Sequence, residues 1–583
     1  MQSEQIMVFF ARTAIARLRG AAAMAAAGAL AACATIPSHA PPAAAASEEI
    51  QILAVNDFHG NIEVPEGTTT YYAGGQPVKA KLGGAARLGA TLAHLRQGHS
   101  ETITVAAGDL VGASPLASAY FLDEPTIMAL NRMGLALASV GNHEFDKGIG
   151  ELKRMQQGGC AVFTQRVPCR LDKPFEGAKF TYLAANVLDG SGKPLFPGTA
   201  IRQFGPVRIG FIGMTLKDTG LLTSPAATKG YHFTDEAETA NALAAQLKAQ
   251  GADAVVLLLH QGGQVDPFFS QDACPKLEGD ILPILSRLAP DIRLVISGHT
   301  HKAYICEVPD ANGAPRLLTS GGRYGYFVTD IRLRIDPATD KILSLSAVND
   351  PVSEAAGEEA DVRQIVDRYG AVSATVAKRV VGRITGSLAA GENALDTPLA
   401  RLVADAQLAA TRDPARGGAQ IGFINSGGVR AGFTTQPDGS VTYGQIFTLQ
   451  PFGNTLEVLE LTGAELKQTL EQQFSDDPSG RFRQSFLIPS QGFTYAFDRS
   501  APVGQRIVAA TLYGQPLDPA RTYRITVNNF LANGGDGFSN LARAKFVADG
   551  GVDLDALEAF IARGATVSPT PRVVDRNPPA PQG

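Results

Sequence analysis

Histidine and acidic side chains recur in this sequence directly after short apolar runs. The runs cover residues 50–55, 103–107, 138–140, 254–259 and 294–296. They are followed, in this order, by Asn56-Asp57-Phe58-His59, Gly108-Asp109, Gly141-Asn142-His143-Glu144-Phe145-Asp146, His260, and Gly298-His299-Thr300-His301. Mixed imidazole and carboxylate donors suit Zn, Mn, Fe or Co better than Ca or Mg. These donor types therefore favour a transition-metal site.

The elements between these motifs determine whether such distant side chains can meet. Helical stretches such as 241–249 and 280–288 alternate with the apolar runs, which predicts an α/β domain with the runs as strands. In open α/β sheets the loops after the carboxyl ends of the strands gather at one edge. The five motifs are expected to converge there. Asp109 is the natural bridge between two ions, and ions about 3.5–4 Å apart assist in-line displacement at phosphorus.

Taken in order, the motifs resemble the signature of the calcineurin-like metallophosphoesterases, and Gly-Asn-His-Glu and Gly-His-Thr-His are its most specific parts. The resemblance implies a four-layer α-β-β-α sandwich and two divalent metal ions, with Zn or Mn expected. His143 resembles the catalytic histidine that protonates the leaving oxygen, and Asp146 would orient it, although Asp146 is also readable as a helix cap. The resemblance implies one metal held by Asp57, His59, Asp109 and His301, and the other by Asp109, Asn142, His260 and His299.

The C-terminal half carries three further motifs. They are Asn425-Ser426-Gly427-Gly428-Val429-Arg430, Gln450-Pro451-Phe452-Gly453-Asn454, and the segment 529–538 with Phe530 and Gly534-Gly535-Asp536-Gly537-Phe538. Together they resemble the C-terminal domain of the 5′-nucleotidase family, similar to periplasmic UDP-sugar hydrolase, so the resemblance covers nearly the whole chain after residue 47.

Two aromatic residues on separate glycine-bearing loops are able to clamp a nucleobase, and stacking contributes roughly 1–3 kcal/mol per base. Phe452 and Phe530 are the predicted pair. The resemblance implies that Asp536 bonds ribose hydroxyls and that Asn425 and Arg430 contact the nucleoside and its phosphate end. The alternative is that both phenylalanines belong to the core.

One departure from the family concerns an additional substrate arginine. Relatives carry it before the helix that starts here near Thr397, but residues 385–393 contain no arginine. Arg383 and Arg401 are candidates without a supporting motif.

A further local prediction is a helix that begins with the capping-box pattern Thr462-Gly463-Ala464-Glu465 and runs to Phe474.

The N-terminus has the layout of an export signal. Three arginines precede the apolar residues 21–32, which are too few to span a bilayer, and Leu30-Ala31-Ala32-Cys33 resembles a bacterial lipobox. We expect a lipid on Cys33 and a periplasmic or cell-envelope lipoprotein, anchored in the outer membrane; an ordinary signal cleaved near Ala46 is the alternative. The four later cysteines are expected to pair 160 with 169 and 274 with 306, although four cysteines allow three connectivities.

The organisation follows from these features. The expected segments are a signal peptide (1–32), a tether rich in Ala and Pro (33–47), the metallophosphoesterase domain (48–355), a linker helix (356–382) with the possible pivots Gly370 and Gly382, the 5′-nucleotidase C-terminal domain (383–572) and a Pro-rich tail (573–583). The formal charge of −5 on 583 residues, without long charge runs, gives no nucleic-acid footprint.

The predicted activity is two-metal hydrolysis of nucleoside 5′-monophosphates, and of nucleotide sugars or other nucleotide phosphoesters. A 2′,3′-cyclic nucleotide phosphodiesterase with 3′-nucleotidase activity is an alternative on the same fold, and the segment 534–538 favours 5′ specificity. A thiosulfate-type sulfur hydrolase would have little use for a base clamp. A non-catalytic surface-binding lipoprotein would have no need of the metal and catalytic residues. A nucleotide is the expected partner, the lipid is the only expected membrane contact, and no protein partner is predicted.

Overall fold

The computed structural model describes residues 49–577, except 165, 224–226, 389–394, 431 and 475–484. The expected signal peptide and the whole of the tether, Cys33 included, lie outside the described residues, as does part of the segment in which the family's additional arginine was sought. Within the described part of the chain, no helix is both long and apolar enough to cross a membrane.

Two six-stranded sheets form the centre of the N-terminal half, here residues 49–351. The first has the order β16 (Lys341–Pro351), β15 (Phe327–Asp336), β1 (Glu49–Val55), β4 (Thr102–Ala107), β5 (Leu137–Ser139) and β6 (Thr181–Leu183). The second has the order β13 (Ala303–Pro309), β14 (Pro315–Gly321), β12 (Ile292–Ser297), β11 (Ala254–His260), β9 (Val207–Thr215) and β8 (Thr199–Phe204). Strands β1, β4, β5 and β6 run parallel, as do β9, β11, β12 and β14.

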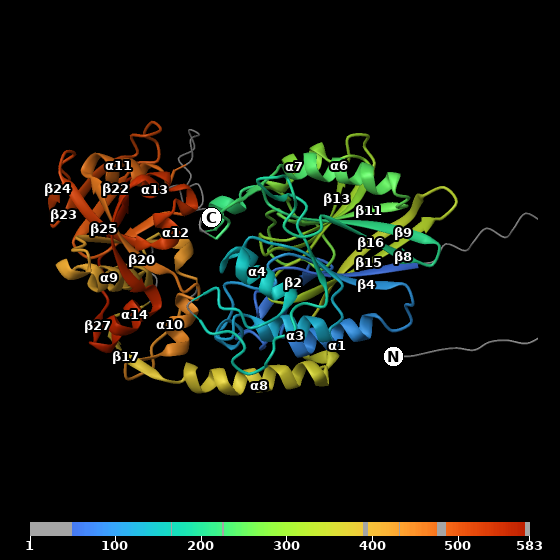
Figure 1. Cartoon of the computed structure of the whole chain (residues 1–583), viewed down its shortest axis with the longest axis horizontal. Coiled ribbons are helices and arrows are strands. Elements are labelled where there is room, and N and C mark those ends of the chain that lie inside the picture. Colours follow the sequence, from blue (N-terminus) through green and yellow to red (C-terminus); the bar gives the residue numbers. More distant parts are fainter. Residues whose placement is uncertain are drawn as a thin grey trace, which may run out of the picture. The chain divides into compact units, whose positions relative to one another are not determined.

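The alternation of side chains along these strands divides the half into four layers. On β1, Ile50 and Ile52 face a core shared with Val256 and Leu258 of β11, whereas Leu53 packs in another cluster with helices. The helices α1 (Ala85–Leu95), α3 (Glu124–Arg132) and α8 (Ala360–Ala377) cover the first sheet, and α6 (Glu236–Ala249) and α7 (Ile281–Arg287) cover the second. Figure 1 shows these two groups of helices on opposite faces of the strands. The α-β-β-α order agrees with the expectation from sequence.

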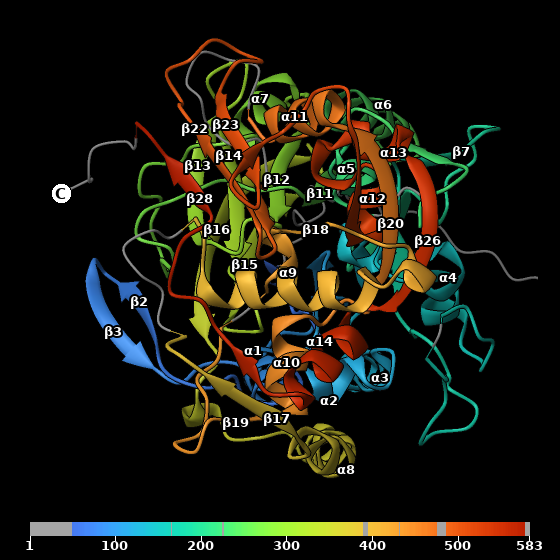
Figure 2. The ribbon, with the colours of Figure 1, turned by 90° about the vertical axis from the view of Figure 1, so that its left-hand side faces the viewer.

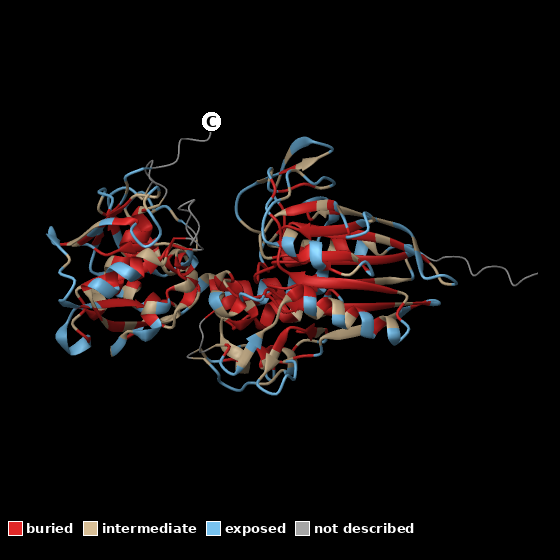
Figure 3. Ribbon diagram, turned by 90° about the horizontal axis from the view of Figure 1, so that it is seen from above, coloured by how far each residue is buried: buried red, intermediate tan, exposed pale blue. Residues whose placement is uncertain are grey.

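The C-terminal half, residues 380–577, is built on a five-stranded mixed sheet. Its order is β21 (Leu487–Pro489), β18 (Ile421–Asn425), β25 (Thr522–Asn528), β20 (Thr455–Thr462) and β26 (Lys545–Val552). The helices α9 (Pro398–Thr411) and α14 (Asp553–Ala562) pack on one face (Figure 2). On the other face lie α11 (Gly463–Glu471), α13 (Ser539–Arg543) and the sheet β24 (Gln515–Pro516), β23 (Ile507–Leu512), β22 (Phe493–Phe497) and β28 (Val573–Asp575). Figure 3 shows buried residues running through the strands of both halves.

Helix α8 links the two halves. It lies within the segment for which the spacing predicts a helix, and it buries Val362, Ile365 and Tyr369 against α1 and α3. The chain then enters β17 (Val380–Thr385), which pairs with β19 (Ser440–Thr442) and β27 (Ala565–Thr566). Of the two glycines considered as pivots, Gly370 lies inside α8 and Gly382 inside β17.

Two local predictions have different outcomes. The capping box at Thr462 and Glu465 is present in both directions, but α11 ends at Glu471 instead of reaching Phe474. The chain turns there, with the amide of Phe474 donating to the carbonyl of Glu471, so that Phe474 packs into the core. Both expected disulfides, Cys160–Cys169 and Cys274–Cys306, are formed.

Candidate metal centre and substrate pocket

The predicted metal ligands lie where the parallel strands of the two sheets end. Asp57 and His59 follow β1, Asp109 follows β4, and Asn142 follows β5. His260 is the last residue of β11, and the segment with His299 and His301 follows β12. Five of these residues have left-handed backbone angles, namely Asp57 (φ 49°), His59 (46°), Asp109 (51°), His299 (70°) and His301 (60°). Such conformations cost about 1–3 kcal/mol each and concentrate at functional sites.

The first group of side chains gathers around Asp57. Nε2 of His301 lies 3.4 Å from Oδ1 of Asp57 and 3.0 Å from Nε2 of His59. Nε2 of His59 is also 3.6 Å from Oδ2 of Asp109. Donor atoms of Asp57, His59 and His301 all lie within 4.8 Å of one another, which is close enough for one ion to contact them together.

The second group shares Asp109 with the first. Oδ2 of Asp109 lies 3.0 Å from Nε2 of His260, and Oδ1 of Asn142 lies 3.2 Å from that same nitrogen. Nδ1 of His299 is 3.1 Å from Oδ1 of Asn142. Asp109, His260 and His299 form a second triad of donor atoms within 4.8 Å. Asp109 thus lies between the two groups, at the place that a bridging ligand occupies.

Backbone groups orient the imidazoles and carboxylates. Nδ1 of His59 is 2.9 Å from the carbonyl of Gly112, and Nδ1 of His260 is 2.8 Å from that of Ala107, so each Nε2 is left for a ligand role. The side chain of Asn56 donates to Oδ2 of Asp57 at 2.7 Å. A methyl group at Gly141 would clash with the carboxylate of Asp109, so glycine is required there.

Glu144 is a positioning residue that sequence reasoning did not assign, although it belongs to the Gly-Asn-His-Glu motif. Its carboxylate is buried and accepts the amides of Asp109 at 2.9 Å, Leu110 at 2.8 Å and Gly141 at 2.5 Å. These hydrogen bonds tie the loop after β4 to the loop after β5. Glu144 therefore fixes the distance between Asp109 and the segment that carries Asn142 and His143.

The charges of the two groups fit a divalent cation. Burial opposes ionisation of Asp109, but His260 and His143 outweigh it and hold the pKa of this carboxyl well below its usual range. Burial lowers the pKa of His299, together with the charge of His260, to about 4, so its ring is neutral. Burial also opposes protonation of His260, yet Asp109 raises its pKa to about 10. The site thus stabilises positive charge beside Asp109, where neutral and anionic donors converge, and the residues present fit divalent metal ions.

His143 lies beside this centre with the geometry of an acid–base residue. Its Nδ1 is 2.8 Å from Oδ2 of Asp146, and its backbone amide donates to Oδ1 of Asp109 at 2.9 Å. Burial lowers the pKa of His143, but the carboxylates of Asp146 and Asp109 outweigh burial, and the net shift is upward. Asp146 therefore favours the tautomer in which Nδ1 carries hydrogen and holds the ring in one orientation. In the structure Asp146 also follows the short helix His143–Phe145 as its C-terminal cap residue, and its side chain is free to pair with His143.

One cavity contains side chains from both halves of the molecule. The N-terminal half contributes Asn142, His143, Asp146, Leu222, Thr223 and His299, and the C-terminal half contributes Asn425, Gly427, Gly428, Arg430, Phe452, Gly453, Asn454, Asn528, Asn529, Phe530 and Asp536. The ring of Phe452 is stacked on that of His143, with centroids 6.2 Å apart and an interplanar angle of 9°. All five predicted substrate residues therefore border the same space as His143.

The C-terminal side of the cavity is also built at strand ends. Asn425 ends β18 and Asn528 ends the parallel strand β25. Nδ2 of Asn425 donates to Oδ2 of Asp536 at 2.8 Å, and Nδ2 of Asn528 donates to Oδ1 of Asn425 at 3.2 Å. The ring of Phe530 lies close above Gly535, because a methyl group there would be 2.5 Å from it. Phe452 and Phe530 are half-buried, as residues of a binding surface are, and not enclosed in the core.

Of the three arginines considered for substrate binding, one borders the cavity and two do not. Arg430 borders the cavity, and one of its terminal nitrogens is buried without a hydrogen-bond partner among the described residues. Arg401 is buried elsewhere and donates to Asp396 and to the carbonyl of Ser568. Arg383 is exposed and pairs with Asp438. Neither Arg383 nor Arg401 borders the cavity. Thr223 and Asn454 also border the cavity, but the sequence did not predict either as a substrate residue. Thr223 belongs to no motif, whereas Asn454 is the last residue of the motif 450–454.

Comparisons with known proteins agree with this arrangement. The calcineurin-like phosphoesterase family matches residues 50–303, and the 5′-nucleotidase C-terminal domain matches residues 380–543. The chain is 30% identical over 557 residues to the cell wall protein Lmo0130 of Listeria monocytogenes. The aligned residues make up 89% of this chain and 67% of that protein. The chain is 28% identical over 494 residues to endonuclease YhcR of Bacillus subtilis, covering 83% of this chain but only 37% of that protein.

A solved structure shares the architecture of both halves. The 5′-nucleotidase precursor of Thermus thermophilus superposes with a TM-score of 0.71 at 25% identity, over 91% of this chain and 100% of that chain. Both family matches, the relative from Listeria and this structure point to one assignment. The chain belongs to the 5′-nucleotidase family of metallophosphoesterases, whose members are hydrolases.

Proposed function

We propose that this protein hydrolyses nucleoside 5′-monophosphates to a nucleoside and phosphate. The observation that carries the proposal is the single cavity in which His143 and the ligand candidates Asn142 and His299 face Phe452 and Phe530. A phosphate at the metal centre and a base between the two rings are the two ends of one nucleotide. The membership of the family and the architecture shared with a 5′-nucleotidase support the same substrate class.

The metal centre is proposed to hold two divalent ions. Asp57, His59, Asp109 and His301 would hold one, and Asp109, Asn142, His260 and His299 the other. The mixed imidazole and carboxylate donor set favours Zn or Mn. When bound, such ions neutralise charge on a phosphoryl group and make water a stronger nucleophile at neutral pH.

His143 and Asp146 are the proposed catalytic pair. The 2.8 Å contact between Nδ1 of His143 and Asp146 fixes the tautomer and leaves Nε2 for the substrate. A protonated His143 stabilises the phosphoryl transition state and transfers its proton to the departing ribose 5′-oxygen, because an alkoxide is a poor leaving group without one. General acid catalysis of this kind contributes typically about 10²–10⁴ in rate.

The nucleoside is proposed to bind to the C-terminal side of the cavity. Phe452 and Phe530 stack on the base, and the carboxylate of Asp536 accepts hydrogen bonds from ribose hydroxyls. Arg430 has a buried nitrogen that finds no hydrogen-bond partner within the described part of the chain, and it would bind an oxygen of the phosphate or ribose. Asn425 holds Asp536 in place through the 2.8 Å hydrogen bond between them.

The position of Asp536 favours 5′-nucleotides over 2′,3′-cyclic nucleotides. A cyclic phosphate esterifies both hydroxyls, so it offers no donor to the buried carboxylate of Asp536, which would keep its hydrogen bond from Asn425 but lose those from the ribose, at a cost of about 1–3 kcal/mol. Nucleotide sugars and other nucleotide phosphoesters keep both hydroxyls free and remain candidate substrates.

Export from the cytoplasm is part of the proposal. Residues 1–32 have the pattern of a signal peptide, and Cys33 is the proposed site of a lipid anchor. The two disulfides support an oxidising compartment such as the periplasm or cell envelope, because disulfides are rare in reducing cytosol.

The test is phosphate release by the purified protein, supplied in turn with Mn and Zn, from AMP, 2′,3′-cyclic AMP, UDP-glucose and p-nitrophenyl phosphate. We expect AMP to have the highest kcat/KM. A preference for the cyclic nucleotide would replace the proposal by the phosphodiesterase alternative. Equal kcat/KM for AMP and p-nitrophenyl phosphate would remove the base clamp, and no turnover by metal-loaded protein would favour a non-catalytic binding role.

A further inference from the structure

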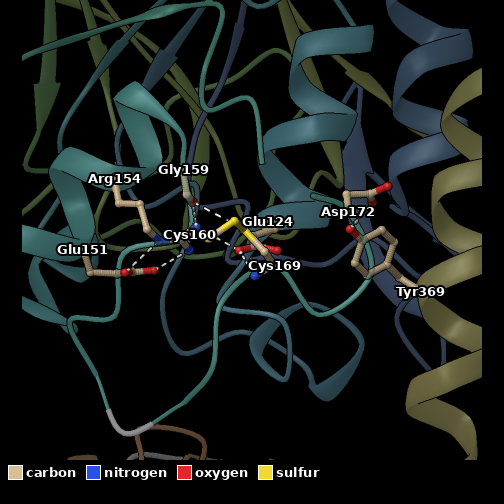
Figure 4. The surroundings of a disulfide bond; sticks show 8 residues. All are labelled: Glu124, Glu151, Arg154, Gly159, Cys160, Cys169, Asp172 and Tyr369. Carbon is tan, nitrogen blue, oxygen red and sulfur yellow. Dashed lines mark hydrogen bonds and ion pairs between the residues drawn. A yellow bond between two sulfur atoms is a disulfide. The ribbon is translucent and has the colours of Figure 1, made fainter. Parts of the chain in front are cut away.

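A disulfide-closed loop, Cys160–Cys169, follows α4 (Gly148–Gln157) in the N-terminal half. Its base is fixed by charged residues that are almost fully buried. Arg154 donates to Glu124 at 2.8 Å, to Glu151 at 2.7 Å and to the carbonyl of Gly159 at 3.0 Å. Glu124 also accepts the backbone amide of Cys169 at 2.9 Å. Figure 4 shows this network around the disulfide.

The chain that leaves the loop is held as well. The hydroxyl of Tyr369, on α8, donates to Asp172 at 2.5 Å, and Arg368 forms an ion pair with the same carboxylate at 2.7 Å. Both ends of the loop are therefore tied to helices α3, α4 and α8 of the N-terminal half. Closure by the disulfide limits where the residues between the two cysteines can lie.

Arg166, a residue of this loop, reaches the C-terminal half. Its guanidinium donates to the carbonyl of Ala119 at 2.9 Å and lies 5.1 Å from the ring centroid of Phe447. A methyl group placed on Gly453 would be 3.5 Å from a terminal nitrogen of Arg166. One side chain thus contacts the N-terminal half, helix α10 (Tyr443–Leu449) and the segment that carries Phe452.

Helix α10 leads directly into two parts of the substrate pocket. Residues 450–454 follow it, with Phe452 stacked on His143. The carbonyl of Leu449, at the end of the helix, accepts the backbone amide of Arg430 at 2.9 Å. A displacement of α10 therefore moves Phe452 and the backbone at Arg430 together.

The seam beside Arg166 is apolar. Leu116 and Ala119 of α2 (Leu116–Ala119) are buried in the same cluster as Ile446 and Phe447 of α10. Arg166 lies at the edge of this seam. Its guanidinium donates to the carbonyl of Ala119 and lies over the ring of Phe447. Cation–π contacts of this type contribute most where the cation is partly desolvated.

We propose that Arg166 is a positioning residue that holds the segment 450–454 against the N-terminal half, and that the Cys160–Cys169 disulfide keeps Arg166 in place. The inference rests on the proposed nucleotidase function, because its consequence is nucleotide affinity. Loss of Arg166 loosens the Phe452 side of the base clamp, whereas the metal centre and His143 are built entirely from the N-terminal half.

The chain provides matched controls. Arg170 lies four positions from Arg166 and also stacks on an aromatic ring, 4.5 Å from the centroid of Tyr120, but Tyr120 belongs to the N-terminal half. The second disulfide, Cys274–Cys306, closes a loop that includes α7 and ends in β13, and none of its cysteines borders the cavity.

The experiment compares KM and kcat for AMP and for p-nitrophenyl phosphate in the wild type and four variants. Arg166→Gln and Cys160→Ser/Cys169→Ser are expected to raise the ratio of the KM for AMP to the KM for p-nitrophenyl phosphate by roughly 3- to 30-fold, the range that a lost cation–π contact corresponds to. Arg170→Gln and Cys274→Ser/Cys306→Ser are expected to leave the ratio at the wild-type value.

The outcomes separate the two proposals. If the wild type hydrolyses p-nitrophenyl phosphate but not AMP, the nucleotidase function fails and the inference fails with it. If the wild type hydrolyses AMP and Arg166→Gln leaves the ratio unchanged, the inference alone is overturned. It is likewise overturned if Arg170→Gln raises the ratio equally, or if Arg166→Gln reduces turnover of both substrates in parallel. Arg166→Gln decides the matter even if the variant without the disulfide does not fold.

Discussion

The two halves of this protein use the same structural device for different tasks. In the N-terminal half, side chains at the ends of parallel strands form the proposed metal centre, in which Asp57, His59, Asp109, Asn142 and His260 are buried and His299 and His301 are half-buried. Backbone carbonyls orient the rings of His59 and His260. In the C-terminal half, Asn425 and Asn528 at strand ends hold Asp536, and the two rings proposed to bind the base are half-buried: Phe452 lies in the segment after α10 and Phe530 in the short helix Asn529–Ala532. The N-terminal half, which carries the candidate metal ligands and His143, is suited to chemistry on a phosphate, and the C-terminal half to selection of the group attached to it.

If the N-terminal half carries the chemistry, changes there should reduce turnover of every ester whose leaving oxygen must be protonated. The largest effect is expected at His143. His143→Ala should lower kcat for AMP by roughly 10²–10⁴-fold, because the ribose alkoxide departs without a proton. The loss should be much smaller with p-nitrophenyl phosphate, since p-nitrophenolate leaves without protonation. The measurement is steady-state phosphate release from both esters in metal-loaded protein.

The exposed His232 provides a control, because it lies on β10 (Tyr231–Phe233) outside the cavity. His232→Ala should keep the wild-type kcat for both esters. Equal losses for AMP and p-nitrophenyl phosphate in His143→Ala would contradict a role as general acid and leave His143 with a role in holding Asp109 or the phosphate.

Changes to the base clamp should produce the opposite pattern. Phe452→Ala and Phe530→Ala each remove stacking worth roughly 1–3 kcal/mol, which corresponds to about a 5- to 150-fold rise in KM for AMP. Kinetics with p-nitrophenyl phosphate should change little. Phe546→Ala, at an exposed phenylalanine of β26, is the matched control. If both clamp variants bind AMP as the wild type does, the two rings serve the seam between the halves and not the nucleobase.

A change at Glu144 tests how far the position of Asp109 depends on one carboxylate. Glu144→Gln places an amide donor against backbone donors of Asp109 or Leu110, so the loop after β4 should shift and metal affinity should fall roughly 10- to 100-fold, as for other groups that orient ligands. The measurement is activity against Mn or Zn concentration after dialysis against a chelator. An unchanged metal titration, equal to that of the exposed-site variant Glu66→Gln, would show that Asp109 is held without Glu144.

The same contrast explains what was predictable from sequence. Each metal motif follows an apolar run, and the rule that strand ends gather at one edge was enough to bring Asp57, Asp109 and His260 together. The capping box at Thr462 was predictable because its hydrogen bonds join only Thr462 and Glu465, which are three positions apart in the chain. The end of α11 was not, since it depends on Phe474 packing against residues distant in the chain.

Contacts between the halves lay outside sequence reasoning for a similar reason. Arg166 belongs to no motif, and its significance comes from Ala119, Phe447 and Gly453, which are far from it along the chain. Arg401 shows the converse: its position near Thr397 made it a candidate for substrate binding, but the ion pair with Asp396 commits it to the core of the C-terminal half.

The smallest effect on activity, and a distinct effect on stability, is expected at Asp553. This residue starts α14, its amide donates to the carbonyl of Asn454, and burial raises the pKa of its carboxyl to about 7. An acid whose pKa is about 3.9 in the unfolded chain and higher in the folded one binds more protons when folded. Its contribution to stability therefore falls as pH rises from about 4 to 7, by at most about 4 kcal/mol.

Asp553→Asn removes this pH-dependent loss of stability, because the amide does not ionise. The variant should therefore raise the free energy of unfolding relative to the wild type more at pH 8 than at pH 5. Chemical denaturation at both pH values measures the difference, with the exposed neighbour Asp555→Asn as a control. A difference that is the same at pH 5 and pH 8 would mean that Asp553 is ionised throughout, and that the segment carrying Phe452 packs against a charge and not a neutral acid.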